Sequence, residues 1–147
     1  MLNFTLYNAG SSAFSATHVD VVPDTGSFPD IRFPNVILNT GGDYNTDTGV
    51  FTCRIPGLYW FSATIGKHWG VNVDLVSCHI RLNGWMKIYL YADPHADNAL
   101  DGYTSTGSVA FQLQTGDRVH VGYCSNEKSI DNSDLTHFSG MLVRPDV

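Results

Sequence analysis

Apolar and polar residues alternate along much of this 147-residue chain, and the clearest alternation lies between residues 51 and 55. A period of two is typical of a β-strand that buries one face. Pro56 and Gly57 interrupt the pattern, because proline cannot donate a hydrogen bond to a sheet. The aromatic and β-branched residues from 58 to 65 then predict a second strand. These two strands and the corner between them form the centre of the predicted fold.

Further strands are predicted on both sides of this pair. Their ranges are 13–22, 31–38, 71–82, 85–91, 108–113, 118–123 and 135–144, and Pro34 cuts the second of them. Asn83-Gly84 predicts a two-residue type I′ hairpin, since both residues tolerate a positive φ. On the strand that follows, alternation places Trp85, Lys87, Tyr89 and Tyr91 on one face. About ten short strands with regular turns predict an all-β sandwich or barrel, with a jelly roll as the first choice.

The composition fits a single globular β-domain. Apolar residues make up 43% of the chain and charged residues 15%, while small polar residues and glycine are frequent in the predicted turns. We expect residues 1–11 to form a tail or linker and residues 12–147 to form the domain. The net charge of −6 argues against nucleic acid as a partner, because phosphate binding needs a basic surface.

The sequence leaves the cellular location open. No apolar run is long enough to span a bilayer, and residues 1–10 lack the basic start and apolar segment of a signal peptide. The chain is therefore interpreted either as the mature form of a secreted protein or as an intracellular protein.

Three cysteines leave two pairing states open. Alternation points Cys53 and Cys78 inward, and it points Cys124 outward if Val121 and Tyr123 face the core. Two buried free thiols and a surface thiol at Cys124 are the favoured interpretation, and an internal disulfide is the alternative. The spacing matches no zinc motif, which needs close cysteine or histidine pairs.

Six histidines are many for this length, and they raise the question of a metal enzyme. They are His18, His68, His79, His95, His120 and His137. Their spacing lacks the clustered pattern of a cupin, and the chain has no Gly-x-Ser-x-Gly motif or phosphate-binding loop. We interpret most of them as exposed histidines on a sheet, with a pH-sensitive interface as the alternative. An enzyme is therefore the least favoured class of function.

The run from Gly49 to Phe61 reads Gly-x-Phe-Thr-Cys-x-Ile-Pro-Gly-x-Tyr-x-Phe and resembles the globular head domain of complement C1q. The resemblance extends over residues 13–146. Further matching pieces are Ala13-Phe14-Ser15-Ala16, then Phe33, Val36, Asn39, Gly42 and Tyr44, then Asn83-Gly84, Gly107-Ser108-Val109, Leu113, Gly116-Asp117-x-Val119 and Phe138-Ser139-Gly140-x-Leu142. Each piece is weak alone, but their order and spacing together are specific.

The resemblance implies a ten-stranded jelly roll of the C1q and tumour necrosis factor type, found in non-enzymatic extracellular proteins that form trimers and bind ligands. Many members recognise patterns in innate immunity, and stalkless single-domain members of bivalve molluscs resemble lectins for microbial glycans. This chain has no Gly-X-Y repeat and no heptads, which favours the stalkless type.

One cysteine departs from the family pattern, and one loop leaves open whether the chain binds calcium. Cys78 lies where complement members carry a bridging cysteine, but Leu90 and Tyr91 stand where its partner is expected, so the comparison implies that this disulfide is missing. The loop from 92 to 102 lies where some members bind calcium, and it carries three candidate ligands, Asp93, Asp97 and Asp101. A solvated acidic loop without a metal is the alternative.

Sugar binding would need an exposed aromatic ring together with side chains that bond hydroxyl groups. The candidates are Lys67, His68, Trp69, Arg81, Trp85, Lys87, Tyr123 and Asn126. For Trp69 and Trp85, packing against a neighbouring strand or subunit is the alternative interpretation.

A trimer implies an apolar seam between subunits, and aromatic residues of the central strands are the candidates for it. They are Tyr59, Phe61, Phe111 and Phe138, with Tyr7 behind them. Trp60 is expected in the core or in the same contact.

Two functions remain in competition. The first is a secreted, trimeric pattern-recognition protein that binds microbial carbohydrate. The alternative is a ligand or scaffold of the C1q and tumour necrosis factor type that binds a protein receptor.

Overall fold

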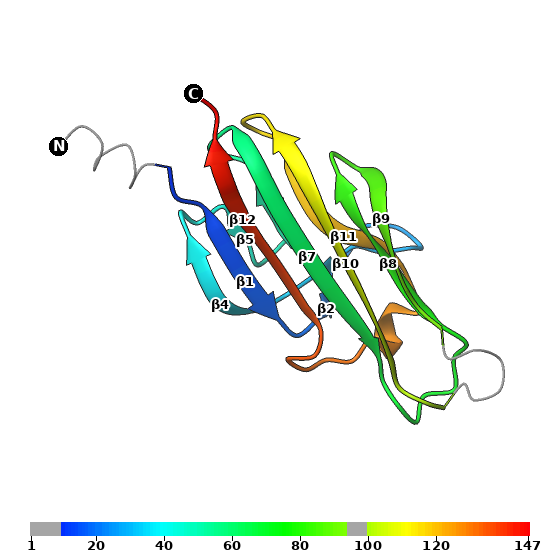
Figure 1. Cartoon of the computed structure of the whole chain (residues 1–147). Helices are drawn as coiled ribbons and strands as arrows, with labels where there is room; N and C mark the ends of the chain where they lie inside the picture. Colours follow the sequence, from blue (N-terminus) through cyan, green and yellow to red (C-terminus); the bar gives the residue numbers. More distant parts are fainter. Residues whose placement is uncertain (1–9, 94–99) are drawn as a thin grey trace.

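The computed structural model describes residues 10–93 and 100–147, and it consists of two packed five-stranded sheets with one small hairpin. All pairs within the sheets are antiparallel. The first sheet has the order β10 (Tyr103–Leu113), β7 (Gly57–Lys67), β12 (His137–Pro145), β1 (Ala13–Thr17) and β4 (Asn35–Thr40) (Figure 1).

The second sheet contains the long β8–β9 hairpin, which lies on the side of the molecule away from β4 (Figure 1). Its order is β5 (Tyr44–Asn45), β6 (Val50–Thr52), β11 (Arg118–Ser125), β8 (Val76–Leu82) and β9 (Trp85–Ala92). β2 (Asp20–Val21) pairs with β3 (Ile31–Arg32), and a single 3-10 turn, η1, covers Glu127–Ser129. No helix in the two described ranges is long and apolar enough to cross a bilayer.

The all-β sandwich predicted from the alternation is confirmed, and most strands lie where they were expected. Pro34 separates β3 from β4, as its missing N–H predicts. Three strands are shorter than predicted. The expected strand 13–22 ends at Thr17 and is followed by the separate short strand β2, the expected strand from 71 starts only at Val76, and the expected strand 51–55 ends at Thr52.

The core lies between the sheets and is rich in aromatic rings. On β7 the odd-numbered residues face inward, so Tyr59 and Phe61 are fully buried. Their rings pack on Phe51 at centroid distances of 5.5 and 5.3 Å. Phe14 joins the same cluster and lies 4.9 Å from Phe138.

The four aromatic residues predicted to form the trimer interface do not lie on the surface, because all four are part of the core. Tyr59, Phe61 and Phe138 have no exposed surface, and Phe111 keeps only 9%. Alternation on β7 turns Trp60 outward instead, and its side chain is exposed. Tyr7 lies outside the described residues. The outward residues of these strands, and not the four predicted ones, are available for contact with another chain.

A β-bulge in β11 reverses the predicted directions of two side chains. The pairing of β11 with β8 shifts between Gly122 and Ser125, and Tyr123 has a φ of 52°. Tyr123 consequently points to solvent, and Cys124 is fully buried. Cys124 forms a disulfide with Cys78, so the predicted surface thiol and free buried Cys78 were wrong.

Cys53 is buried and free, as predicted. Its thiol lies 3.2 Å from the carbonyl oxygen of Ile55 and 3.7 Å from the Tyr59 hydroxyl. Burial raises the pKa of this thiol above its ordinary value. The thiol is therefore a packed core group rather than a reactive one.

The hairpin between β8 and β9 has the predicted turn but not the predicted faces. Asn83 and Gly84 both have positive φ, at 51° and 86°. A register shift pairs Ile80 with Ile88 but Arg81 with Met86, which leaves Lys87 as the bulged residue. Trp85 is therefore paired with the inward-facing Leu82, and it does not share a face with Tyr89 and Tyr91.

Candidate functional site: an aromatic row on the second sheet

Five aromatic side chains form a continuous row on the outer face of the second sheet. Neighbouring ring centroids lie 4.5–6.0 Å apart in the order Phe28, Tyr123, His79, Tyr89 and Tyr91. Every member except the half-buried His79 is exposed. We call this set the aromatic row. Exposed rings gathered in this way form a candidate contact surface.

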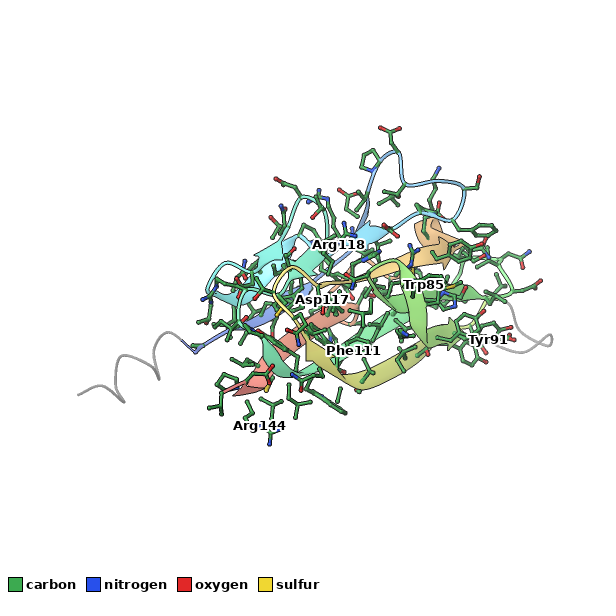
Figure 2. The ribbon with its side chains drawn as sticks, turned by 90° about the horizontal axis from the view of Figure 1, so that it is seen from above. Trp85, Tyr91, Phe111, Asp117, Arg118 and Arg144 are labelled. Carbon is green, nitrogen blue, oxygen red and sulfur yellow. A yellow bond between two sulfur atoms is a disulfide. The ribbon has the colours of Figure 1, made fainter. Side chains whose placement is uncertain are left out.

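Strand pairing builds most of the row. His79 on β8 pairs directly with Tyr89 on β9, and their rings stack at 4.5 Å with an interplanar angle of 10°. Tyr91 follows two residues later on the same face. Tyr123 joins from β11 because the bulge turns it outward, and Phe28 comes from the loop before β3. Figure 2 shows Tyr91 and Trp85 on the side of the molecule away from Arg144.

A charged cluster fastens the loop that carries Phe28 to the sheet. The Asp30 carboxylate lies 3.2 Å from Arg81 Nη1 and 3.3 Å from His120 Nε2. Burial alone would raise the pKa of Asp30, but His120 and Arg81 outweigh this effect and lower the pKa below its ordinary value. The carboxylate lies against Gly122, where a Cβ would meet Asp30 Oδ1 at 1.8 Å. Gly122 therefore allows the loop to approach β11.

Two shallow hollows meet at Ser125 and Asn126, and the first of them includes Phe28 of the aromatic row. The first has a volume of about 390 Å³, and its lining includes Ser27, Phe28, Glu127 and Lys128. The second, of about 400 Å³, is lined by Asn72, Val73, Asp74 and Leu75. Both contain Ser125 and Asn126, so they meet at this point. Both volumes fall in the range of ligand sites in proteins.

The predicted ligand-binding residues do not form one site. Tyr123 belongs to the aromatic row, Arg81 lies beside it on β8, and Asn126 lines both hollows. Arg81 is held by the Gly84 carbonyl oxygen, with its Nη2 at 2.6 Å, as well as by Asp30. Asn126 Nδ2 donates to the Leu75 carbonyl oxygen at 2.7 Å.

Lys67 was predicted as an exposed ligand-binding residue, and this prediction was wrong. It ends β7 with only 2% of its surface exposed, and its Nζ donates to the carbonyl oxygens of Val71 at 2.9 Å and Asp101 at 2.8 Å. Carbonyl oxygens of this kind satisfy the hydrogen bonds of a buried ammonium group. Lys67 therefore joins two loops from inside rather than facing a ligand.

Trp69 and Trp85 are as exposed as sugar binding would require, at 73% and 74%. His68 is exposed beside Trp69, and its Nδ1 lies 2.6 Å from the Trp69 carbonyl oxygen. Lys87 is exposed at the bulge of β9. None of these residues belongs to the aromatic row.

The candidate calcium ligands are placed only in part. Asp97 lies outside the described residues, as does His95. Asp93 Oδ2 accepts a hydrogen bond from the Tyr91 hydroxyl at 3.0 Å, and Asp101 lies beside Tyr103. Across residues 10–93 and 100–147, no group of three or more His, Cys, Asp or Glu side chains is arranged to hold a metal.

Sequence reasoning missed His79, Tyr89, Tyr91 and Phe28 as site residues. The hairpin signal at Asn83-Gly84 would by itself place Ile88 opposite His79, and only the bulge at Lys87, which no local pattern predicts, shifts Tyr89 into that position. No local sequence pattern predicts that Phe28 joins the row. Its loop is held against the sheet by the ion pair of Asp30 with Arg81, which are far apart in the sequence.

Solved structures with this fold include C1q and tumour necrosis factor-like domains. The globular domain of zebrafish complement 1qA protein aligns with a TM-score of 0.68 and 16% identity, covering 92% of this chain and 99% of that one. Murine APRIL, in a crystal at pH 8.0, aligns with a TM-score of 0.69 and 12% identity, covering 90% and 99%. These likenesses confirm the predicted jelly roll.

Curated relatives carry the same domain as part of longer chains. A complement C1q subcomponent of the rat is 36% identical over 118 residues, which are 79% of this chain and 44% of that protein. A human complement C1q subcomponent is 30% identical over 136 residues, which are 92% and 51%. The chain spans about half the length of these relatives. A family model described as the C1q domain matches residues 13–143. The chain therefore belongs to the C1q domain family.

Proposed function

We propose that this chain is a secreted, non-enzymatic recognition protein that binds microbial glycans and assembles as a homotrimer. The observation that carries the proposal is the aromatic row, which leaves exposed rings beside two hollows lined by polar groups. A sugar ring has apolar faces and a rim of hydroxyl groups, so it suits aromatic surface next to hydrogen-bonding side chains. Relatives that are complement C1q components support a recognition role without catalysis.

Secretion is supported by the cysteine chemistry. The Cys78–Cys124 disulfide is of a kind that forms and persists in oxidising compartments. The relatives named above are complement components, and a mouse complement C1q tumor necrosis factor-related protein 6 is 30% identical over 90% of this chain.

The outer face of the first sheet supports the homotrimer. Strand pairing aligns Ala110, Trp60, Met141 and Ala13 across β10, β7, β12 and β1. The exposed large apolar residues of this sheet are Val36, Ile37, Leu38, Trp60, Met141 and Val143. An apolar face of this kind, opposite the aromatic row, suits burial against further copies of the chain.

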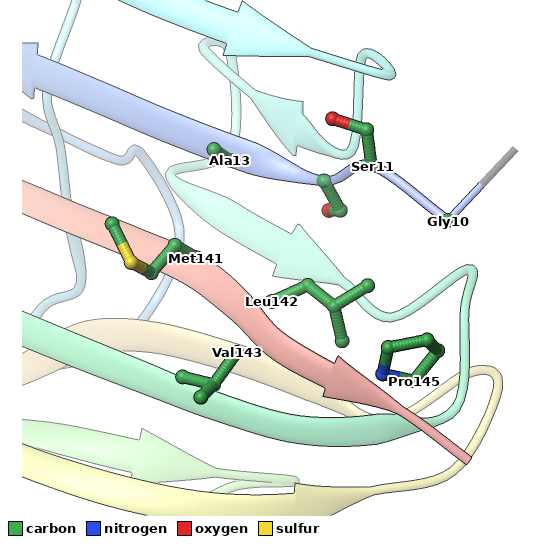
Figure 3. Close-up of a pocket in the computed structure, with 8 residues that line it drawn as sticks. Gly10, Ser11, Ala13, Met141, Leu142, Val143 and Pro145 are labelled. Carbon is green, nitrogen blue, oxygen red and sulfur yellow. The ribbon is translucent and has the colours of Figure 1, made fainter. Parts of the chain in front are cut away.

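Small hydroxyl residues form the next row on this face. Ser108, Ser62, Ser139 and Ser15 lie in register across the same four strands. Ser108 donates to Ser62 at 3.0 Å, and Ser139 donates to Ser15 at 3.0 Å. A recess of about 410 Å³ lies where Met141, Leu142, Val143 and Pro145 meet Ser11 and Ala13, as Figure 3 shows. Short side chains and a recess allow a second copy to approach closely.

Calcium remains part of the proposal. Asp93, Asp97 and Asp101 supply hard oxygen ligands of the type that calcium prefers. The proposed role of the ion is to order the loop from 92 to 102 for ligand binding.

A glycan array probed with the purified protein tests the function, once with calcium and once with a chelator. Saturable binding in calcium that disappears with the chelator supports the lectin and assigns the metal to the aspartates. Binding under both conditions supports the lectin and removes the metal. No binding by folded protein under either condition contradicts the glycan function and leaves a protein receptor as the better candidate.

A protein receptor is favoured by one specific observation. Tyrosine predominates in the aromatic row, and tyrosine and arginine are enriched at the centres of protein interfaces. Arg81 lies on β8 close to the row.

A further inference from the structure

We propose, on the basis of glycan binding as the function, that the sugar is held at the corner formed by Phe28 and Tyr123. The two hollows that meet at Ser125 and Asn126 extend this corner. The ligand class is an uncharged oligosaccharide. Four features of the structure lead to this inference.

The first feature is the backbone of Tyr123. Its φ of 52° lies in the left-handed region, which is unfavourable for a residue with a Cβ. Glycine would turn the chain here without that cost. The turn lets Cys124 face Cys78, but the disulfide does not use the Tyr123 ring. Contact with a ligand explains why a large ring occupies this position.

The second feature is the exposure of both rings at the corner. Phe28 and Tyr123 lie 5.0 Å apart, and they retain 46% and 42% of their surface in water. Burying apolar surface is favourable, so a sugar face placed on these rings gains binding energy. The fastened loop holds Phe28 in place before the ligand arrives, because Asp30 is paired with Arg81 and His120.

The third feature is the supply of hydrogen-bonding groups around the rings. Ser27, Ser125 and Glu127 line the first hollow, and Asn72 and Asp74 line the second. The Asn126 side chain between them is fixed by its bond to Leu75. Polar groups on both sides of one corner suit a chain of sugars better than a single ring, because each hollow can take a separate residue of the chain.

The fourth feature is the charge of the two hollows. Glu127 and Asp74 carry negative charges, against one positive charge on Lys128. The whole chain carries a net charge of −6. The net negative charge of the hollows and that of the whole chain both repel sialylated, sulfated or uronic acid sugars. Carboxylates accept hydrogen bonds from hydroxyl groups, so an uncharged oligosaccharide remains the fitting ligand.

Calorimetric titration with defined hexasaccharides tests this site on the disulfide-intact full chain. The neutral probes are cellohexaose, laminarihexaose, chitohexaose and mannohexaose, and the anionic probe is a heparin hexasaccharide. We expect wild-type protein to bind at least one neutral probe more tightly than the heparin probe. Tighter binding of the heparin probe overturns the inference about ligand charge.

Variants locate the site. We expect Tyr123→Gly to bind at least tenfold more weakly. Its melting temperature should stay unchanged or rise, because glycine adopts the positive φ at this position without strain. Phe28→Ala should also bind at least tenfold more weakly. Trp85→Ala removes a ring elsewhere that is more exposed than either of these, and this variant should keep wild-type affinity.

The outcomes separate the two proposals. Wild-type protein that binds none of the probes and nothing on the array contradicts glycan binding and this site together. Wild-type binding that survives in both Tyr123→Gly and Phe28→Ala overturns the site alone. Loss of binding in Trp85→Ala, with affinity kept in Tyr123→Gly, moves the site to the end of the β8–β9 hairpin.

Discussion

His79 is a titratable group within the aromatic row. Burial lowers its pKa below the ordinary value of 6.5, and the positive charge of Arg81 adds to this, against an opposing effect of the Tyr123 carbonyl. The folded protein therefore prefers the neutral ring. Below pH 6.5 the unfolded chain binds more protons at His79 than the folded chain does. The contribution of neutral His79 to the free energy of unfolding is therefore present above pH 6.5 and falls as the pH decreases.

We expect the free energy of unfolding to drop between pH 7.5 and pH 5.5 less steeply in His79→Gln than in the wild type. The difference should be no more than about 1 kcal/mol, because the ring is partly exposed and water screens it. Urea unfolding at several pH values measures it. Equal slopes for wild type and His79→Gln would contradict the assignment.

Residue patterns predicted inward and outward faces wherever a strand was regular. Alternation on β7 correctly predicts that every second residue is buried, and Cys53 lies inside as expected. The pattern failed at Tyr123, because one residue with a positive φ shifts every direction that follows. It also failed at Lys67, since a charged residue next to a turn gives no local sign that three carbonyl groups will surround its amine.

At the scale of elements, the disulfide joins β8 to β11 across 46 positions of sequence. Closing a loop of this length in the unfolded chain contributes about 4 kcal/mol in a chain-entropy model. We expect the double variant Cys78→Ala/Cys124→Ala to lose about 2–5 kcal/mol of unfolding free energy in urea titrations. Reductant should destabilise the wild type and leave the double variant unchanged. A wild type that reductant does not affect, although its disulfide is shown to be reduced, would refute this account.

The strands were predictable from the sequence, but several of their connections were not. Asn83-Gly84 fixed one hairpin correctly. The bulge at Lys87 was invisible, because alternation continues through it in the sequence while the pairing shifts. The family resemblance places the disulfide partner of Cys78 on β9, whereas Cys124 lies on β11, the other neighbour of β8. Order along the chain does not show which of two neighbouring strands supplies a contact.

At the scale of the whole molecule, the two outer faces of the sandwich are assigned different tasks. In the proposed trimer the first sheet contributes Trp60 and Met141, which pair on β7 and β12. We expect Trp60→Glu or Met141→Glu to dissociate the assembly, because three buried charges would meet without partners. Sedimentation equilibrium should give about 48 kDa for wild type, three times the 16.1 kDa chain, and 16.1 kDa for the variants. Trp85→Glu is the matched control on the second sheet and should stay trimeric.

The family and fold could be predicted from ordered motifs spread over most of the chain, because a jelly roll needs the same turns and core rings wherever it occurs. The contact surfaces of the molecule could not be predicted in this way. Tyr59 and Phe61 looked like interface residues, but a sandwich turns its most aromatic faces inward. The aromatic row gathers residues from positions 28 to 123, so only the folded chain brings them together.

Hydroxyl-radical footprinting tests the assignment of the two faces most directly, since it reports the solvent access of tryptophan, methionine, tyrosine and phenylalanine side chains in one experiment. Without ligand, Trp60 and Met141 should be protected by the trimer, while Trp69, Trp85 and Tyr123 react. The neutral hexasaccharide that binds best should then protect Phe28 and Tyr123 and leave Trp85 reactive. Free reaction of Trp60 and Met141, or protection of Trp85 in place of Tyr123, would contradict the account.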